Sequence, residues 1–199
     1  MAERILLACA ALLLALVVGL ALFWHPEPPE RVLPKAAGGG GGDFTLQSAS
    51  GPVSLSDFKG KVVLLYFGYT YCPDICPTSL VATAAGLKQL SAEEQARVAM
   101  IFISVDPERD TPVRLKEYVE FFHPNIVGVT GSAESLADIA RRYGAFYAKQ
   151  SVATAGGGYV VDHSADTYVI GTDGKLVGKI AHATPPEQVA GEIRKHLQK

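Results

Sequence analysis

The apolar residues of this 199-residue chain fall into short continuous runs between polar segments, after one long run near the N-terminus. Runs such as 62–67 (VVLLYF) and 98–105 (VAMIFISV) are typical of strands buried on both faces. Apolar residues at helical spacing, as in 77–90, indicate amphipathic helices. The pattern predicts strands at 62–67, 98–105, 125–129, 145–149, 167–170 and 175–180, and helices at 77–90, 111–122, 132–143 and 185–197. This alternation predicts an α/β fold with a mixed central sheet flanked by helices.

Two local signals refine this prediction. Asp173-Gly174 lies between the last two apolar runs, which is a strong hairpin signal. Asp110 precedes the predicted helix 111–122 and is expected to cap it. His123 follows that helix and is expected to be a capping or surface group.

The long N-terminal run is expected to cross a membrane. Nineteen of the 20 residues from Ile5 to Trp24 are apolar and none is charged, which is long enough to span the hydrocarbon core as a helix. Arg4 before it predicts a cytoplasmic N-terminus. The alternative is a cleaved signal peptide, whose apolar region usually has 7–15 residues. No small-residue cleavage site follows before Trp24, so we expect an uncleaved anchor at 1–24.

Residues 25–42 (HPEPPERVLPKAAGGGGG) are expected to form a linker, because prolines and then glycines dominate it. The remaining residues, 43–199, are predicted to form one domain, which is long enough for a sizeable core.

Charge and cysteine content exclude several classes of protein. The net charge of −2 gives no basic excess of the kind that nucleic-acid binders carry. Three cysteines are too few for a disulfide-dense scaffold or a four-cysteine zinc site. Cys9 lies in the apolar run, which leaves two cysteines in the predicted domain.

The remaining two cysteines form the segment CPDICP (72–77), between the strand 62–67 and the helix 77–90. α/β folds place their sites at such strand-to-helix turns. The start of a helix favours thiolates, so both thiols are expected to have lowered pKa values. Two such thiols can form a disulfide or hold a soft metal ion.

A metal site needs at least a third ligand. The histidines are His25, His123, His163, His182 and His196. His163 precedes the predicted strand 167–170 and follows a glycine-rich loop, but spacing alone does not choose it over His182.

The chain resembles the Sco/SenC family of copper-binding, thioredoxin-like proteins that help assemble cytochrome c oxidase. The matching segments are FGYTYCPDICPTSL (67–80), SVDPERDTP (104–112) and VDHSADTYVIGTDG (161–174), with DFTL (43–46) and LSDFKGKVVLLYF (55–67). The resemblance covers essentially all of 43–199 and implies a thioredoxin-like fold.

The resemblance implies that Cys72, Cys76 and His163 are copper ligands. Two thiolates and an imidazole suit Cu(I) and tolerate Cu(II). It also implies a redox-active Cys72–Cys76 disulfide. Asp162, beside the histidine, is expected to orient the imidazole or to face a partner. The same two roles, support of a metal ligand or contact with a partner, are expected for Asp74.

The expected function is a membrane-anchored copper metallochaperone for the binuclear copper site of cytochrome c oxidase. Its expected partners are the copper-site oxidase subunit and another copper chaperone or a thiol reductase. Thioredoxin-like oxidoreductases usually carry Cys-x-x-Cys facing a cis-proline, whereas here the spacer is longer and no proline lies between Val152 and Thr184. This favours metal handling over disulfide exchange.

Two alternatives stay open. A thiol–disulfide reductase would keep the oxidase's copper-ligand cysteines reduced, and a copper or redox sensor would act through partner binding. We expect the domain to lie in the periplasm of a bacterium, on the cytoplasmic membrane, rather than in a mitochondrion, because no Arg/Ser-rich transit segment precedes the anchor.

Overall fold

The computed structural model describes residues 40–151 and 158–198, with residues 4–7, 9–10, 12–13 and 19 near the N-terminus. The chain divides into two units, Met1–Leu33 and Pro34–Lys199. The described residues of the first unit are helical. Most of the expected anchor and linker lies outside the described residues. Within the described part of the chain, no helix has both the length and the apolar character needed to cross a membrane.

The core of the second unit is a mixed sheet of five strands. Its strands are β3 (Val62–Gly68), β4 (Val98–Ser104), β5 (Ile126–Val129), β8 (Thr167–Ile170) and β9 (Leu176–Ile180), in the spatial order β5-β4-β3-β8-β9. The first three run parallel, and β8 and β9 run antiparallel to their neighbours. Every residue of β3 and β4 is buried, as their continuous apolar runs predict. The predicted mixed sheet is confirmed.

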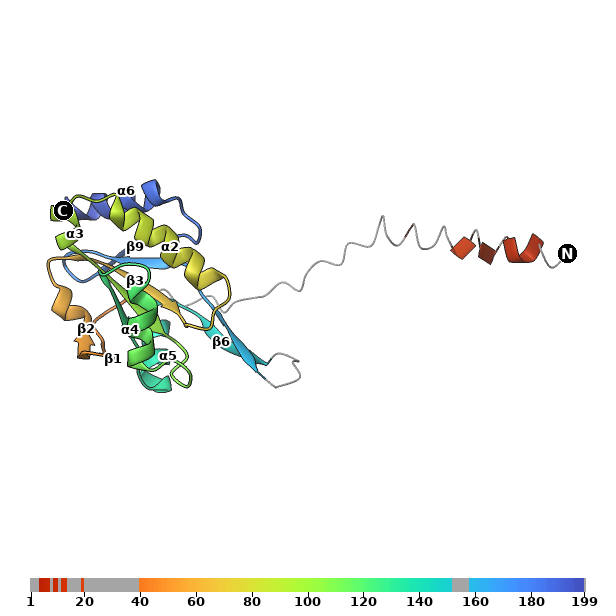
Figure 1. Cartoon of the computed structure of the whole chain (residues 1–199), viewed down its shortest axis with the longest axis horizontal. Helices are drawn as coiled ribbons and strands as arrows, with labels where there is room; N and C mark the ends of the chain where they lie inside the picture. The colour runs from red at the N-terminus through yellow and green to blue at the C-terminus, as the bar shows by residue number, and fades with distance from the viewer. Residues whose placement is uncertain are drawn as a thin grey trace. The chain divides into compact units, whose positions relative to one another are not determined.

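Helices cover both faces of this sheet (Figure 1). The helices α2 (Ile75–Lys88), α4 (Pro112–Glu120) and α6 (Pro186–Leu197) lie on one face, where the stacked rings of Tyr66 and Phe102 contact α2 and α4. The helix α5 (Ala133–Tyr143) lies on the other face, where its Tyr143 contacts Phe67 of β3. A short helix, α3 (Ala92–Ala96), precedes β4. The contact between α2 and α6 depends on Gly86, because a Cβ there would lie 2.7 Å from Val189 Cγ1.

Two small hairpins were not predicted from the sequence in full. The first consists of β1 (Thr45–Ser48) and β2 (Gly51–Ser54), followed by the 3-10 turn η1 (Leu55–Phe58). The second, called the β6–β7 hairpin below, pairs β6 (Tyr147–Ser151) with β7 (Tyr159–His163) in a separate two-stranded sheet. The segment before β8 was expected to be a loop, because β7 is short and adjoins a glycine run.

Asp110, which was expected to cap a helix, and His123, which was expected to be a capping or surface group, are both buried. Thr111 caps α4, since its hydroxyl accepts a hydrogen bond from the Arg114 amide at 3.3 Å, so the prediction that Asp110 is the cap is wrong. The Asp110 carboxylate is fully buried instead. His123 is only 4% exposed, and its Nδ1 accepts from the Asn125 amide at 3.1 Å. Its burial lowers its pKa, so a surface position is also wrong.

Candidate metal centre

Cys72, Cys76 and His163 come together at one edge of the central sheet. Their ligand atoms, the two Sγ atoms and a ring nitrogen, all lie within 4.8 Å of one another. Cys72 lies in the turn after β3, and Cys76 lies in the first turn of α2. His163 ends β7, just before β8. Because β8 is antiparallel to β3, the amino end of β8 lies beside the carboxyl end of β3, and this topology joins the histidine to the cysteines.

The two cysteines differ in exposure. Cys76 is fully buried, whereas Cys72 is half-buried. Gly68, the last residue of β3, makes room for the inner sulfur, since a Cβ at that position would lie 2.7 Å from Cys76 Sγ. An ion held here would therefore be reached from the Cys72 side.

The His163 ring is held in one orientation. Its Nδ1 lies 2.9 Å from the Ser164 carbonyl, and a carbonyl only accepts, so Nδ1 carries a proton. Nε2 lies 3.1 Å from Cys76 Sγ, and in the neutral ring it presents a lone pair to the cysteines. The rings of Tyr66 and Tyr69 stand edge-on to the imidazole, with centroids 6.0 and 5.8 Å away. The imidazole is thus set to bind a metal through Nε2.

The two thiols have opposite acidities. Hydrogen bonding from the Cys76 side chain, with a further hydrogen bond from the Cys76 amide, outweighs burial and lowers the pKa of Cys72 to about 3. Burial first, and then the neighbouring Cys72 sulfur, raise the pKa of Cys76. The expectation of two acidic thiols therefore holds for Cys72 and is wrong for Cys76. Its burial depends on β3 and α2 packing together, which the spacing of the cysteines does not reveal.

Asp162 precedes His163 on β7, and Asp74 lies between the two cysteines in the chain. Side chains alternate along a strand, so Asp162 projects from the opposite face of β7 to His163. The described orienting contact on the imidazole comes from Ser164, and a partner-facing role for Asp162 stays a prediction. Asp74 is exposed just before α2, and its carboxylate accepts from the Thr78 hydroxyl at 3.3 Å.

The other described histidines of the domain lie outside this cluster. His182 Nδ1 is 2.8 Å from the Ser79 hydroxyl, and His196 Nε2 is 3.2 Å from Glu192. Gly68 and Ser164 are site residues that the sequence analysis did not single out. A glycine at the end of a wholly apolar strand was the available signal for Gly68.

A family model described as SCO1/SenC matches residues 34–198. The bovine mitochondrial protein SCO2 homolog is 41% identical over 160 residues, which cover 79% of this chain and 60% of that protein. This chain therefore spans about 60% of the length of that relative.

Solved structures agree with the sequence match. Copper-bound ScoI from Bradyrhizobium japonicum is 37% identical with a TM-score of 0.70, over 79% of this chain and 99% of that one. BsSco, described as having a disulfide switch and as a member of the Sco family of cytochrome c oxidase assembly proteins, is 28% identical with a TM-score of 0.63, over 81% and 95% of the two chains. With this fold and the matched segment of the family model, the chain belongs to the SCO1/SenC family.

Proposed function

We propose that this chain binds copper through Cys72, Cys76 and His163 and delivers it during cytochrome c oxidase assembly. The observation that carries the proposal is the approach of two sulfurs and one imidazole nitrogen to within 4.8 Å at the sheet edge. Thiolate and imidazole ligands suit Cu(I), and the imidazole and thiolates also accommodate Cu(II). Copper in the solved ScoI relative supports the same cargo here.

The site is suited to passing the ion on. Three protein ligands leave coordination positions open, and the half-buried Cys72 lies on the outer side of the ion's place. Metal ligands must be deprotonated. Cys72 is already a thiolate at neutral pH, so binding mainly expels the proton of Cys76. The receiving partner we propose is the binuclear copper site of an oxidase subunit, in line with the membership of BsSco in a family of cytochrome c oxidase assembly proteins.

A copper titration tests the proposal. Cu(I) is competed between the protein and a chromophoric chelator, with the parent, His163→Ala and His182→Ala compared. The control, His182, also contacts α2 through Ser79 but lies outside the ligand cluster. We expect His163→Ala to weaken binding at least about tenfold and His182→Ala to bind like the parent. Equal binding by His163→Ala would exclude the three-ligand site.

The acidity of Cys72 favours a second function, thiol–disulfide reduction of the oxidase's copper-ligand cysteines. The Cys72 thiolate would attack the partner's disulfide, which forms a mixed disulfide and releases one partner thiol. Cys76, as its thiolate, would then attack the Cys72 sulfur and release the second partner thiol. The products are a Cys72–Cys76 disulfide and a reduced partner. Oxidase activity in cells separates the two functions. If His163→Ala supports assembly and Cys76→Ser does not, reduction is the better description.

We further propose that the domain lies in the periplasm on an N-terminal anchor. The support is the 20-residue apolar run from Ile5 to Trp24 with Arg4 before it. Protease treatment and membrane fractionation of intact spheroplasts test this. Added protease should digest an outward-facing domain, and in untreated spheroplasts an anchored domain should stay with the membrane fraction. A domain released into the soluble periplasmic fraction would contradict an uncleaved anchor.

A further inference from the structure

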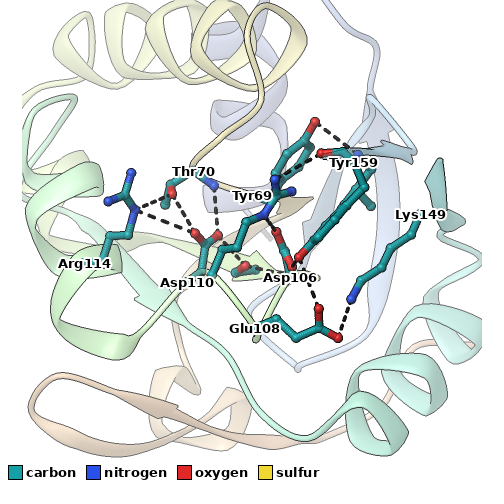
Figure 2. Close-up of polar contacts among 11 residues, drawn as sticks. Tyr69, Thr70, Asp106, Glu108, Asp110, Arg114, Lys149 and Tyr159 are labelled. Atoms are coloured by element: carbon teal, nitrogen blue, oxygen red, sulfur yellow. Dashed lines mark hydrogen bonds and ion pairs between the residues drawn. The ribbon is translucent and has the colours of Figure 1, made fainter. Parts of the chain in front are cut away.

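The β6–β7 hairpin carries His163 but does not belong to the central sheet. Its two strands pair with each other. The position of the histidine relative to the cysteines therefore depends on what fastens this hairpin to the rest of the domain. The fastening contacts come from the loops that follow β3 and β4 (Figure 2).

Three side chains form a closed set of contacts at the start of β7. The Tyr159 hydroxyl donates to Asp106 Oδ1 at 2.7 Å. The Arg109 guanidinium pairs with the other carboxylate oxygen of Asp106 and donates to the Tyr159 carbonyl at 3.0 Å. The guanidinium carbon also lies 3.7 Å from the centroid of the Tyr159 ring. Asp106 is fully buried, so each of these bonds to it is shielded from water.

These contacts are transmitted along β7 to the metal centre. Residues two apart share one face of a strand, so Tyr159, Val161 and His163 point the same way. The Val161 amide donates to the Tyr69 hydroxyl at 3.2 Å, which fastens the middle of the strand. His163 is the last of the three and contacts Cys76. It lies about 13 Å along the strand from Tyr159, at roughly 3.3 Å per residue. A small tilt of β7 at Tyr159 therefore displaces the imidazole.

The same arginine contacts the cysteine side of the centre. Its guanidinium carbon lies 4.9 Å from the centroid of the Tyr71 ring, and Tyr71 immediately precedes Cys72. Arg109 thus touches both the hairpin that carries the histidine and the turn that carries the outer cysteine.

We propose that Asp106, Arg109 and Tyr159 form a latch that docks the β6–β7 hairpin and positions His163 for copper. They are positioning residues and contact no ligand atom of the centre in the contacts described. The copper part of this inference rests on the proposed function, whereas the docking part concerns the metal-free chain.

Residue-resolved hydrogen exchange on the metal-free full chain tests the docking. The variant Tyr159→Phe keeps the ring and removes the hydroxyl bond to Asp106. We expect the Val161 amide, which bonds to Tyr69, to exchange about tenfold faster or more. Amides of the β6–β7 ladder report whether the hairpin itself is intact and are expected to keep their protection.

Matched controls separate docking from general destabilisation. Tyr143→Phe also removes one hydroxyl bond of a buried tyrosine, to the Gly42 carbonyl at 2.6 Å. Lys116→Ala breaks an exposed pair with Glu120 on α4, away from the hairpin, and such a pair contributes little. Both are expected to leave Val161 exchange close to the parent. Arg109→Lys, which cannot span both of its partners, is a second latch variant and should behave like Tyr159→Phe.

Electron paramagnetic resonance of the Cu(II)-loaded full chain then tests the effect on the imidazole. We expect Tyr159→Phe to weaken or broaden the nitrogen hyperfine signal of His163 and to lower copper affinity about tenfold, while Tyr143→Phe changes neither. Parent-like Val161 exchange and a parent-like nitrogen signal in both latch variants would overturn the latch. If the parent binds no copper, the proposed function fails, and the exchange experiment alone decides the docking.

Discussion

Adding one methyl group at Gly68 is expected to disturb the metal centre at its buried sulfur, Cys76 Sγ. The new Cβ would lie 2.7 Å from Cys76 Sγ and 3.0 Å from ring carbons of Phe102 and Tyr66. Ordinary contact begins at 3.4 Å, so the sulfur would have to move by about 0.7 Å. Metal–ligand distances tolerate only about 0.2 Å. We therefore expect Gly68→Ala to lower Cu(I) affinity by about tenfold or more, besides an overpacking cost of about 1–3 kcal/mol.

Gly86→Ala is the matched control for this change. Its Cβ would lie 2.7 Å from Val189 Cγ1 at the α2–α6 contact, so it also overpacks the core, although the better helix propensity of alanine offsets up to about 1 kcal/mol. Chelator competition measures Cu(I) affinity, and urea unfolding measures the free energy of unfolding. Only Gly68→Ala should lose copper affinity. The reasoning is refuted if Gly68→Ala binds copper as tightly as Gly86→Ala does.

The remaining predictions concern acidity and stability. Since the pKa of Cys72 is lowered to about 3, its alkylation rate should stay flat from about pH 5 to 8, where a thiol of ordinary pKa near 8.5 reacts about tenfold faster per pH unit. Cys76→Ala removes the largest cause of that acidity and should slow the reaction at pH 5; an unchanged rate would contradict the assignment. Asp110→Ala leaves the Thr70 amide, the Thr70 hydroxyl and the Ser104 hydroxyl without their buried acceptor and should cost about 3 kcal/mol of unfolding free energy in urea. Gly174 has a φ of 82° with open space around its Cβ position, so Gly174→Ala should cost about 1 kcal/mol and lower Tm by about 2–4 °C; no shift would mean that the turn relaxes freely.

The sequence predicted the central elements because their signals are local. Continuous apolar runs identify β3 and β4, and Asp173-Gly174 identifies the β8–β9 turn, which the structure confirms. The β6–β7 hairpin was harder to predict, since its strands are short and His163 pairs with Tyr147 across a long connection. Its stability comes from side chains elsewhere in the domain, as with Tyr159 and Asp106, and such contacts have no local pattern.

Only part of the metal centre could be predicted, because only the spacing of its cysteines is a local signal. The spacing of Cys72 and Cys76 indicates a site by itself, whereas the choice of His163 over His182 required the family resemblance. Burial was the property that the sequence missed. Asp110 was expected to be a simple helix cap, yet it bonds across the fold to Thr70. The raised pKa of the Cys76 thiol also follows from burial, which the turn sequence does not encode.

The separation of the ligands along the chain has a mechanical consequence. Cys76 and His163 are 87 residues apart in sequence, so an ion bound to both closes a loop of that length. If loop closure is treated as for a disulfide, such a cross-link disfavours the unfolded chain by about 4.6 kcal/mol. The cargo would then act as a reversible staple of the tertiary structure. Release of the ion would remove this stabilisation, so the Tm of the domain should be lower without copper than with it. The Tm would therefore report whether a molecule carries its ion.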